Sequence, residues 1–379
     1  MYSNLRSSVI RSFMSDKTSN LNLRFIGSLR GLAGLWIVLY HSHFLPTPNP
    51  SRPLWASFIV DVGGMAVMLF FVISGFSLMY TYPNRLKSKM PFTDFYLHRF
   101  FRIAPLYYFA LSLYLIWDRL HLDYQHPVKS IATNLTFTFN LIPGEQTAIV
   151  WAGWTIGVEA FFYLIFPFVY KYCKTLINSI KFLILTLIIA NLSKLLLPYL
   201  IHKPEVLAVY QQWFFIRYMP VFAAGIVLFR IWSSPKQILL AQNTRESLGY
   251  ILLLISGLLL FTRPAPIAQI LGDELYSQAF AFTLLVLGLS MLPVRILVNP
   301  VFEWYGKLSY SIYLLQPMVI WHMRYLTENI YERTGKTAGF FLSTIMIVVT
   351  LSFVSYITER FIESPCIRLG KKVSKFLTR

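Results

Sequence analysis

Charged residues are scarce in this chain of 379 residues, since Asp, Glu, Lys and Arg make up only 13% of it. A typical soluble domain contains about a quarter. Acidic residues are the rarer sign, with 16 Asp and Glu against 34 Lys and Arg. The two cysteines, Cys173 and Cys366, are too few for a disulfide framework and have no CxxC spacing. This composition excludes an ordinary soluble domain and a disulfide-stabilised secreted one.

Several catalytic motifs are also missing. The sequence contains no GxxxxGK[ST] phosphate-binding loop, no HExxH pair and no Cys/His cluster with metal-ligand spacing. It contains no GxSxG nucleophile elbow. We therefore expect no metal site, and the chemistry has to come from other residues.

Hydrophobic residues, in contrast, form 56% of the chain, and apolar runs of about 20 residues recur along its whole length. These runs predict an all-α integral membrane protein with about ten transmembrane helices. The predicted spans are 25–44, 60–80, 103–118, 150–170, 182–201, 213–232, 248–262, 276–293, 308–323 and 338–357.

Basic residues are unevenly distributed between the predicted loops. With a cytoplasmic N-terminus, the inner segments hold 24 Lys and Arg and the outer loops hold eight. The positive-inside rule therefore places both termini in the cytoplasm. The net charge of +18 is then explained by the membrane surface, and we expect no binding to nucleic acid. Residues 1–24 are expected to be a cytoplasmic segment, 25–366 a transmembrane domain and 367–379 a basic cytoplasmic tail.

The first predicted span carries a cation near its start, Arg30, and an imidazole near its end, His41. A step of 11 residues is about three helical turns, so both side chains fall on nearly the same face, roughly 16 Å apart along the axis. Ionisable residues inside membrane helices usually mark a pathway or a reaction site. Alternatively, Arg30 reaches the inner surface and His41 lies among the outer headgroups. Their shared face favours a function.

Arg99 and Arg102 lie where an inner loop enters the third predicted span. The i, i+3 spacing puts them on one face at a helix start, where free N–H groups and two guanidiniums suit a phosphorylated ligand. The alternative is that they anchor the helix to anionic lipids.

Glu159 lies near the middle of the fourth predicted span. A carboxylate there needs a partner or is protonated, and His41 and Arg217 are candidate partners. A purely structural buried pair is the alternative.

The ninth predicted span carries a polar stripe that includes Ser309, Tyr313 and Gln316. These groups are candidates for lining an acceptor cavity, or for hydrogen bonds between helices. Small residues such as Gly27, Gly31 and Gly75 are better explained by close helix packing.

Six stretches, in this order along the chain, resemble the membrane-bound acyltransferase family 3, the O-acyltransferases that modify cell-envelope glycans. They are Phe25–Ala33 with His41, Leu69–Phe76, Arg99–Pro105, Trp154–Tyr163, Leu308–Leu314 and Arg360–Pro365. The resemblance covers nearly the whole chain. It implies a ten-helix core, acetyl-CoA supplied from the cytoplasm and an acceptor hydroxyl presented near the outer face of a bacterial cytoplasmic membrane. The partners implied are acyl-CoA, a saccharide or lipid-linked glycan and membrane lipids.

The resemblance also has two departures. Relatives often carry an acidic residue where this chain has Met68, and His where it has Gln316. The first removes a possible carboxylate, although Asp61 lies seven residues earlier on a similar helical face. The second places more of the acid–base chemistry on His41. Both departures are also compatible with a different acceptor.

On this basis the sequence predicts that Arg30, Arg99 and Arg102 bind the phosphates of acetyl-CoA. His41 is expected to act as general base on a sugar hydroxyl, and Glu159 to orient the imidazole. A transient acetyl-His41 is the alternative route. The competing function is a non-enzymatic transporter of a glycan precursor or small solute, since intramembrane Arg, His and Glu also suit a proton-coupled carrier. Against it, the sequence shows no repeated halves.

Overall fold

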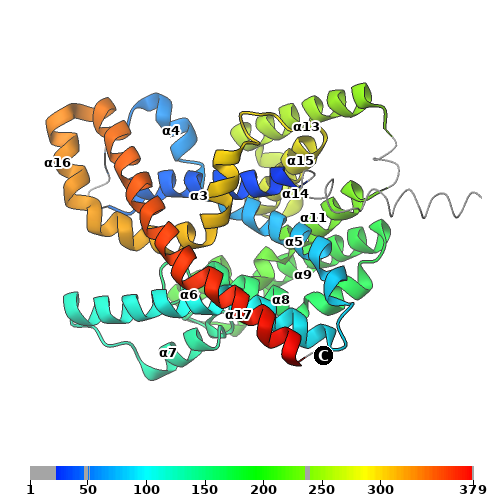
Figure 1. Cartoon of the computed structure of the whole chain (residues 1–379), viewed down its shortest axis with the longest axis horizontal. Helices are drawn as coiled ribbons and strands as arrows, with labels where there is room; N and C mark the ends of the chain where they lie inside the picture. Colours follow the sequence, from blue (N-terminus) through cyan, green and yellow to red (C-terminus); the bar gives the residue numbers. More distant parts are fainter. Residues whose placement is uncertain (1–22, 47–49, 51, 235–239, 378–379) are drawn as a thin grey trace, which may run out of the picture.

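The computed structural model describes residues 23–46, 50, 52–234 and 240–377, and within them every regular element is helical (Figure 1). The predicted segment 1–24 lies outside the described residues, apart from its last two. The helices are α3 (Arg24–Phe44), α4 (Leu54–Val60), α5 (Ala66–Arg85), α6 (Pro91–His121), α7 (Val128–Leu135), α8 (Trp154–Tyr172), α9 (Leu176–Leu200), α10 (Pro204–Trp213), α11 (Phe215–Trp232), α13 (Gln242–Thr262), α14 (Ala265–Leu271), α15 (Glu274–Met291), α16 (Pro300–Thr358) and α17 (Ser364–Leu377), with short helical turns η1 (Gly63–Met65), η2 (Phe139–Leu141) and η3 (Glu359–Glu363).

A helix of the structure coincides with each of the ten predicted spans. Among the described residues, seven helical stretches are long and apolar enough to cross a membrane. They are Leu54–Arg85, Pro91–His121, Leu176–Leu200, Pro204–Trp232, Gln242–Thr262, Glu274–Met291 and Pro300–Leu377. The all-helical membrane architecture is thus confirmed, whereas the count of ten crossings and the orientation of the termini stay predictions. Helices α3 and α8 are not among the seven, and these two carry Arg30, His41 and Glu159.

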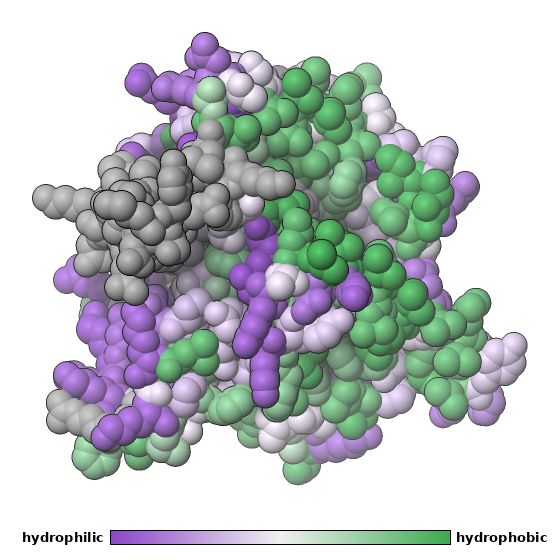
Figure 2. All heavy atoms as spheres, turned by 90° about the vertical axis from the view of Figure 1, so that its right-hand side faces the viewer, coloured by the Kyte–Doolittle hydropathy of each residue, from purple (hydrophilic) through white to green (hydrophobic). Residues whose placement is uncertain are grey.

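Helices α9 and α13 present apolar side chains to the outside. Exposed residues on them include Ile184, Ile188, Leu195, Leu254 and Leu258. Figure 2 shows that hydrophobic side chains cover large parts of one face of the molecule, mainly in its right-hand half, with some hydrophilic residues between them. A soluble monomer rarely exposes so much apolar surface, and a lipid environment is its natural partner.

Helix α3 packs directly against the first half of α16, backbone to backbone. A Cβ atom at Gly31 would collide with the carbonyl oxygen of Phe302, and one at Gly306 would collide with the carbonyl oxygen of Gly27. Only glycine permits so close an approach. Gly34 also faces Ser309. Because the residue numbers of the contacting pairs rise together, the two helices run parallel, and each turn of α3 lies beside a defined turn of α16.

Helix α16 is interrupted at Gly335, whose φ of 75° is outside the helical range. The chain turns back there, as Figure 1 shows. After the turn, Ser352 donates a hydrogen bond to the Tyr305 hydroxyl, and Thr358 donates one to Ser311. The two halves therefore correspond to the ninth and tenth predicted spans.

The expected basic tail lies, as far as Leu377, within helix α17, which packs along α6 (Figure 1). A Cβ atom at Gly370 would collide with the ring of Phe101. Two buried hydrogen bonds hold α17 at its ends: Ser374 donates to Asp94 of α6, and Ser311 donates to Glu363 just before α17 begins. The C-terminal helix thus supports the helix that carries Arg99 and Arg102.

Candidate functional site

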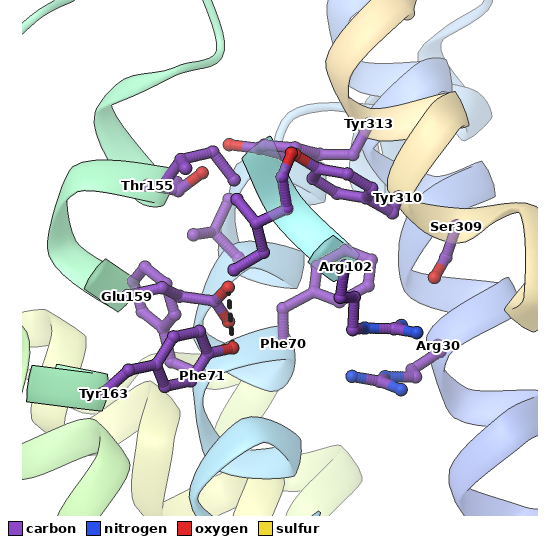
Figure 3. Close-up of a pocket in the computed structure, with 13 residues that line it drawn as sticks. Arg30, Phe70, Phe71, Arg102, Thr155, Glu159, Tyr163, Ser309, Tyr310 and Tyr313 are labelled. Atoms are coloured by element: carbon purple, nitrogen blue, oxygen red, sulfur yellow. Dashed lines mark hydrogen bonds between the residues drawn. The ribbon is translucent and has the colours of Figure 1, made fainter. Parts of the chain in front are cut away.

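A small cavity of about 70 Å³ lies where α3, α5, α6, α8 and α16 meet. Figure 3 shows its labelled side chains. The polar residues that line it are Arg30, Arg102, Thr155, Glu159, Tyr163, Ser309, Tyr310 and Tyr313. Apolar residues including Phe70 and Phe71 complete the wall. The cavity therefore combines a cationic side, a carboxylate and several hydroxyl groups.

The guanidinium groups of Arg30 and Arg102 lie side by side in this cavity, one from α3 and one from α6 (Figure 3). Arg99, one turn before Arg102, stacks over the rings of Phe95 and Tyr163 at 5.6 and 5.4 Å from their centroids. Among the described residues, none of these three arginines forms a salt bridge within 4.0 Å. The Nε atoms of Arg30 and Arg99 are shielded from solvent and have no hydrogen-bond partner.

Two carboxylates lie close enough to these three arginines to interact with them electrostatically. Glu159 interacts electrostatically with Arg30 and Arg99, and its Oε2 accepts a hydrogen bond of 3.0 Å from the Tyr163 hydroxyl. Glu363 interacts electrostatically with Arg102. Three cations against two carboxylates leave the cluster one positive charge in excess. Like charges held close together in a partly buried site favour an anion between them.

A second cavity, of about 720 Å³, contains His41. Its wall is rich in aromatic rings, namely Tyr40, Tyr114, Trp151, Trp154, Trp213, Tyr218 and Tyr313. Polar groups among them are Asp118, Thr147, Gln212 and Arg217. A roomy cavity with aromatic walls and a few polar groups is typical of a site for a ligand of moderate size.

The imidazole of His41 is 9% exposed and packs edge-on against Trp151, with ring centroids 4.9 Å apart. The side chain of Gln316 lies beside it and interacts with it. Nδ1 of His41 and Oε1 of Gln316 are both shielded, and neither makes a hydrogen bond of ordinary geometry. His41 is thus held by packing and has one polar neighbour.

The two cavities share a wall. Val67 of α5 and Tyr313 of α16 line both of them. Arg30 lies on one side of this wall and His41 on the other, although both belong to α3. The arrangement offers an anion site and an imidazole in adjoining chambers.

A known protein family matches most of the chain. The acyltransferase 3 family, described as an acyltransferase domain, matches residues 23–358. The chain belongs to the membrane-bound acyltransferase family 3. No curated protein and no solved structure matches the chain. The acyltransferase is therefore an integral membrane protein of helical architecture, and the matched region contains α3, α6, α8 and α16 with all of the predicted site residues.

The structure places the predicted site residues of this acyltransferase in three groups. Arg30, Arg102, Glu159 and Ser309 line the small cavity, and Arg99 adjoins it. His41 lines the large cavity, and Tyr313 lines both. Gln316 contributes to neither wall but lies behind His41.

The predicted contact between Glu159 and His41 does not occur among the described residues. Glu159 accepts from Tyr163 instead, and Arg217 pairs with Asp273 at 2.8 Å. The reason is geometric: the shared wall at Val67 and Tyr313 separates the two cavities. The sequence places charges on helices, but it does not say which helix faces which.

The two residues that depart from the family pattern, Met68 and Gln316, both lie near His41. Met68 is buried and lines the His41 cavity, so no carboxylate stands at that point. Asp61 does not replace it, because its carboxylate pairs with Arg52 at 2.7 Å. Gln316 is fully buried beside the imidazole.

Several residues of the site were not predicted. Trp151 and Asp118 line the His41 cavity, and Asp118 pairs with His126 at 2.7 Å. Asp118 is an acidic residue at the end of an apolar helix, a signal that the sequence does contain. Glu363 belongs to one of the family stretches, but its electrostatic interaction with Arg102 emerges only from the fold.

Proposed function

We propose that this acyltransferase moves an acyl group, expected to be acetyl, from cytoplasmic acyl-CoA to a hydroxyl group of a cell-envelope glycan or glycolipid in a bacterial cytoplasmic membrane. The observation that carries the proposal is the pair of adjoining cavities, one with unpaired arginines and the other with His41, divided by Val67 and Tyr313. Such a division suits an acyl transferase, because the donor, acyl-CoA, is an anion and the acceptor is not required to be one.

Arg30, Arg99 and Arg102 would hold the phosphate groups of coenzyme A. Charge-assisted hydrogen bonds from guanidinium to phosphate are strong and often bidentate. The shielded, unpartnered Nε atoms of Arg30 and Arg99 support this assignment, because buried donors are normally satisfied. The thioester end of the donor would then extend past Tyr313 toward His41.

The reaction at His41 would follow general-base catalysis. The imidazole takes the proton of the acceptor hydroxyl while the oxygen attacks the thioester carbonyl. The carbon–sulfur bond breaks, and the imidazolium returns the proton to the departing coenzyme A thiolate. The acceptor leaves as an ester and the donor as free coenzyme A. We propose this direct transfer. Recovery of an acetylated His41 from quenched enzyme would instead support the two-step route through acetyl-His41.

The aromatic wall of the large cavity supports a saccharide as acceptor. The apolar faces of sugar rings pack on aromatic side chains, and their hydroxyls need polar partners such as Asp118, Gln212 and Arg217. Membrane lipids would surround the apolar outer faces of α9 and α13.

The experiment is a turnover assay in membranes with labelled acetyl-CoA. The wild-type protein is expected to release free coenzyme A and to label an envelope glycan, and the His41→Ala variant at matched expression to do neither. Release of coenzyme A by His41→Ala at the wild-type rate would refute the assignment of His41. A glycan exported without acetyl-CoA consumption would favour a transporter.

A further inference from the structure

Two buried polar atoms without a hydrogen-bond partner belong to neighbouring side chains on α3 and α16. They are Nδ1 of His41 and Oε1 of Gln316; the two side chains interact with each other, and both atoms are shielded from solvent without a hydrogen bond of ordinary geometry. Gln316 has no exposed surface, and His41 has 9%. Buried polar atoms without a partner are rare and costly, so two of them on neighbouring side chains call for an explanation.

The orientation of the Gln316 amide is fixed by a neighbour. Its Nε2 donates to the backbone carbonyl of Tyr313 at 3.4 Å. A carbonyl oxygen only accepts, so the amide nitrogen must be the atom that faces it. This leaves Oε1, an acceptor, as the free end of the amide near the imidazole.

His41 has two ring nitrogens in different surroundings. Nδ1 is shielded, whereas Nε2 is not among the shielded unpartnered atoms and no hydrogen bond occupies it within the described residues. Nε2 is therefore the nitrogen that opens to the large cavity, where the acceptor hydroxyl would bind. For Nε2 to accept a proton, the neutral ring must carry its own proton on Nδ1.

We propose that Gln316 is the positioning residue of His41: its amide oxygen accepts the Nδ1 proton and so keeps Nε2 free as the base. The inference rests on the proposed function and deepens it. The hydrogen bond closes when the acceptor is bound, since catalytic hydrogen bonds are often long in a ligand-free enzyme. Gln316 thereby takes the place that the sequence assigned to Glu159.

The remaining groups near His41 do not supply this contact. On the cavity wall, Asp118 of α6 is paired with His126, and Arg217 of α11 is paired with Asp273. Arg217 is a cation and offers no acceptor. Tyr40, Tyr114, Tyr218 and Tyr313 also line the cavity, and in the part of the chain that the structure describes none of them forms a hydrogen bond with the imidazole.

An amide orients the ring without adding a negative charge. This distinguishes the pair from a carboxylate–imidazole pair, in which the carboxylate also stabilises the imidazolium. Replacing Gln316 with Glu should therefore keep the acceptor oxygen and add the charge. Replacing it with Leu removes the oxygen at similar size.

The test compares the steady-state kinetics of Gln316→Leu and Gln316→Glu with wild type, using acetyl-CoA and isolated membranes. We expect Gln316→Leu to lower kcat roughly 10- to 100-fold, a part of what a general base contributes, while KM for acetyl-CoA stays within about twofold. We expect Gln316→Glu to retain turnover, with the acid limb of its pH profile moved to higher pH, because the carboxylate stabilises the protonated ring.

Gln242→Leu serves as the control, since Gln242 lies at the exposed start of α13, where its side chain donates a hydrogen bond to Glu246. Coenzyme A binding to each purified variant shows whether it is folded. If a variant does not fold, solid-state ¹⁵N NMR of wild-type protein decides the same point, and Nδ1 of His41 should carry the proton at neutral pH.

Three results would contradict the proposed role of Gln316. Wild-type kcat in a folded Gln316→Leu variant, an unshifted acid limb in Gln316→Glu, or a proton on Nε2 of His41 in the wild-type protein would overturn the role of Gln316. Failure of the proposed function is a different result, because the wild-type protein itself would then consume no acetyl-CoA.

Discussion

Arg30 and His41 belong to the same helix, α3, but they line different cavities, and Val67 and Tyr313 form the wall between the two. The wall therefore separates the arginines proposed to bind the donor from the imidazole proposed to act as the base. Arg30 faces Arg102 in the small cationic cavity (Figure 3). His41 faces aromatic rings in the large cavity. Binding of the donor's charge and removal of the acceptor's proton can therefore be altered one at a time.

Glu159 is expected to affect donor binding and not the basicity of His41. In Glu159→Gln, one negative charge near the arginines is lost, which is worth roughly 1–2 kcal/mol for two charges about 10 Å apart at an effective dielectric constant of about 20. KM for acetyl-CoA should fall by roughly 5- to 30-fold. The acid limb of the pH profile should stay in place.

Steady-state kinetics across pH check this. Tyr163→Phe is the companion variant, since it removes the hydrogen bond to Glu159 and leaves the carboxylate in place. An acid limb that moves in Glu159→Gln would show that Glu159 acts on His41 after all.

Gly31 is expected to be irreplaceable because its neighbour is backbone. A Cβ atom there would meet the carbonyl oxygen of Phe302, so Gly31→Ala must push α3 away from α16. Overpacking of this kind costs about 1–3 kcal/mol or more. Thermal unfolding in detergent should show a lower midpoint and a reduced yield of folded protein.

The matched control is Gly257→Ala in α13, where, apart from its chain neighbours and the backbone of its own helix, no atom of the described residues lies within 4 Å of the added Cβ. Alanine is the better helix former by about 1 kcal/mol, so this variant should be as stable as wild type or slightly more stable. Equal losses in the two variants would contradict the close packing of α3 and α16.

Ser311 is expected to matter for stability through Glu363. Glu363 is 4% exposed and accepts a hydrogen bond from Ser311, which in turn accepts one from Thr358. Ser311→Ala leaves a buried carboxylate with one donor fewer, at a cost of about 1–3 kcal/mol. A fall in the unfolding midpoint measures it. Ser112→Ala, at an exposed serine of α6, should be nearly neutral.

Asp273 is expected to make the protein sensitive to acid. Burial alone would raise the pKa of its carboxyl, but hydrogen bonds from Arg217 and Lys194 outweigh burial and lower it below the usual 3.8. A carboxyl with a lowered pKa in the folded state contributes stability that is present above its unfolded pKa of about 3.9 and is lost as pH falls through the folded value.

The measurement is the unfolding midpoint between pH 7 and pH 3. Wild type should lose stability below about pH 4. In Asp273→Asn the protein should be less stable at pH 7, and this part of the acid dependence should disappear. An unchanged acid dependence in Asp273→Asn would mean that other carboxyls cause it.

The sequence predicted the helices well, because apolar runs of membrane length are an unambiguous signal. It also predicted that Gly31 serves packing, since small residues at close spacing have few other uses in such a helix. It did not predict which residues the two halves of α16 bring together, or that α17 packs on α6. Both depend on contacts between distant residues, such as Ser311 with Thr358 and Ser374 with Asp94.

The same limit applies to the site. Helical spacing put Arg30 and His41 on one face, and both do face cavities. The partner of each side chain depends on which helix lies opposite. Glu159 interacts with Arg30 and with Tyr163. Gln316, which stands where relatives often have His, lies beside His41.

The most direct test of the two-cavity account measures coenzyme A binding and acetyl-CoA turnover on the same purified variants. His41→Ala should bind coenzyme A with the wild-type Kd but show no turnover. Arg30→Gln and Arg102→Gln should each weaken binding by roughly 10- to 100-fold, the value of one charge-assisted hydrogen bond, while Arg119→Gln, at an exposed arginine, should not. Loss of coenzyme A binding in His41→Ala, or wild-type binding in both arginine variants, would contradict the account.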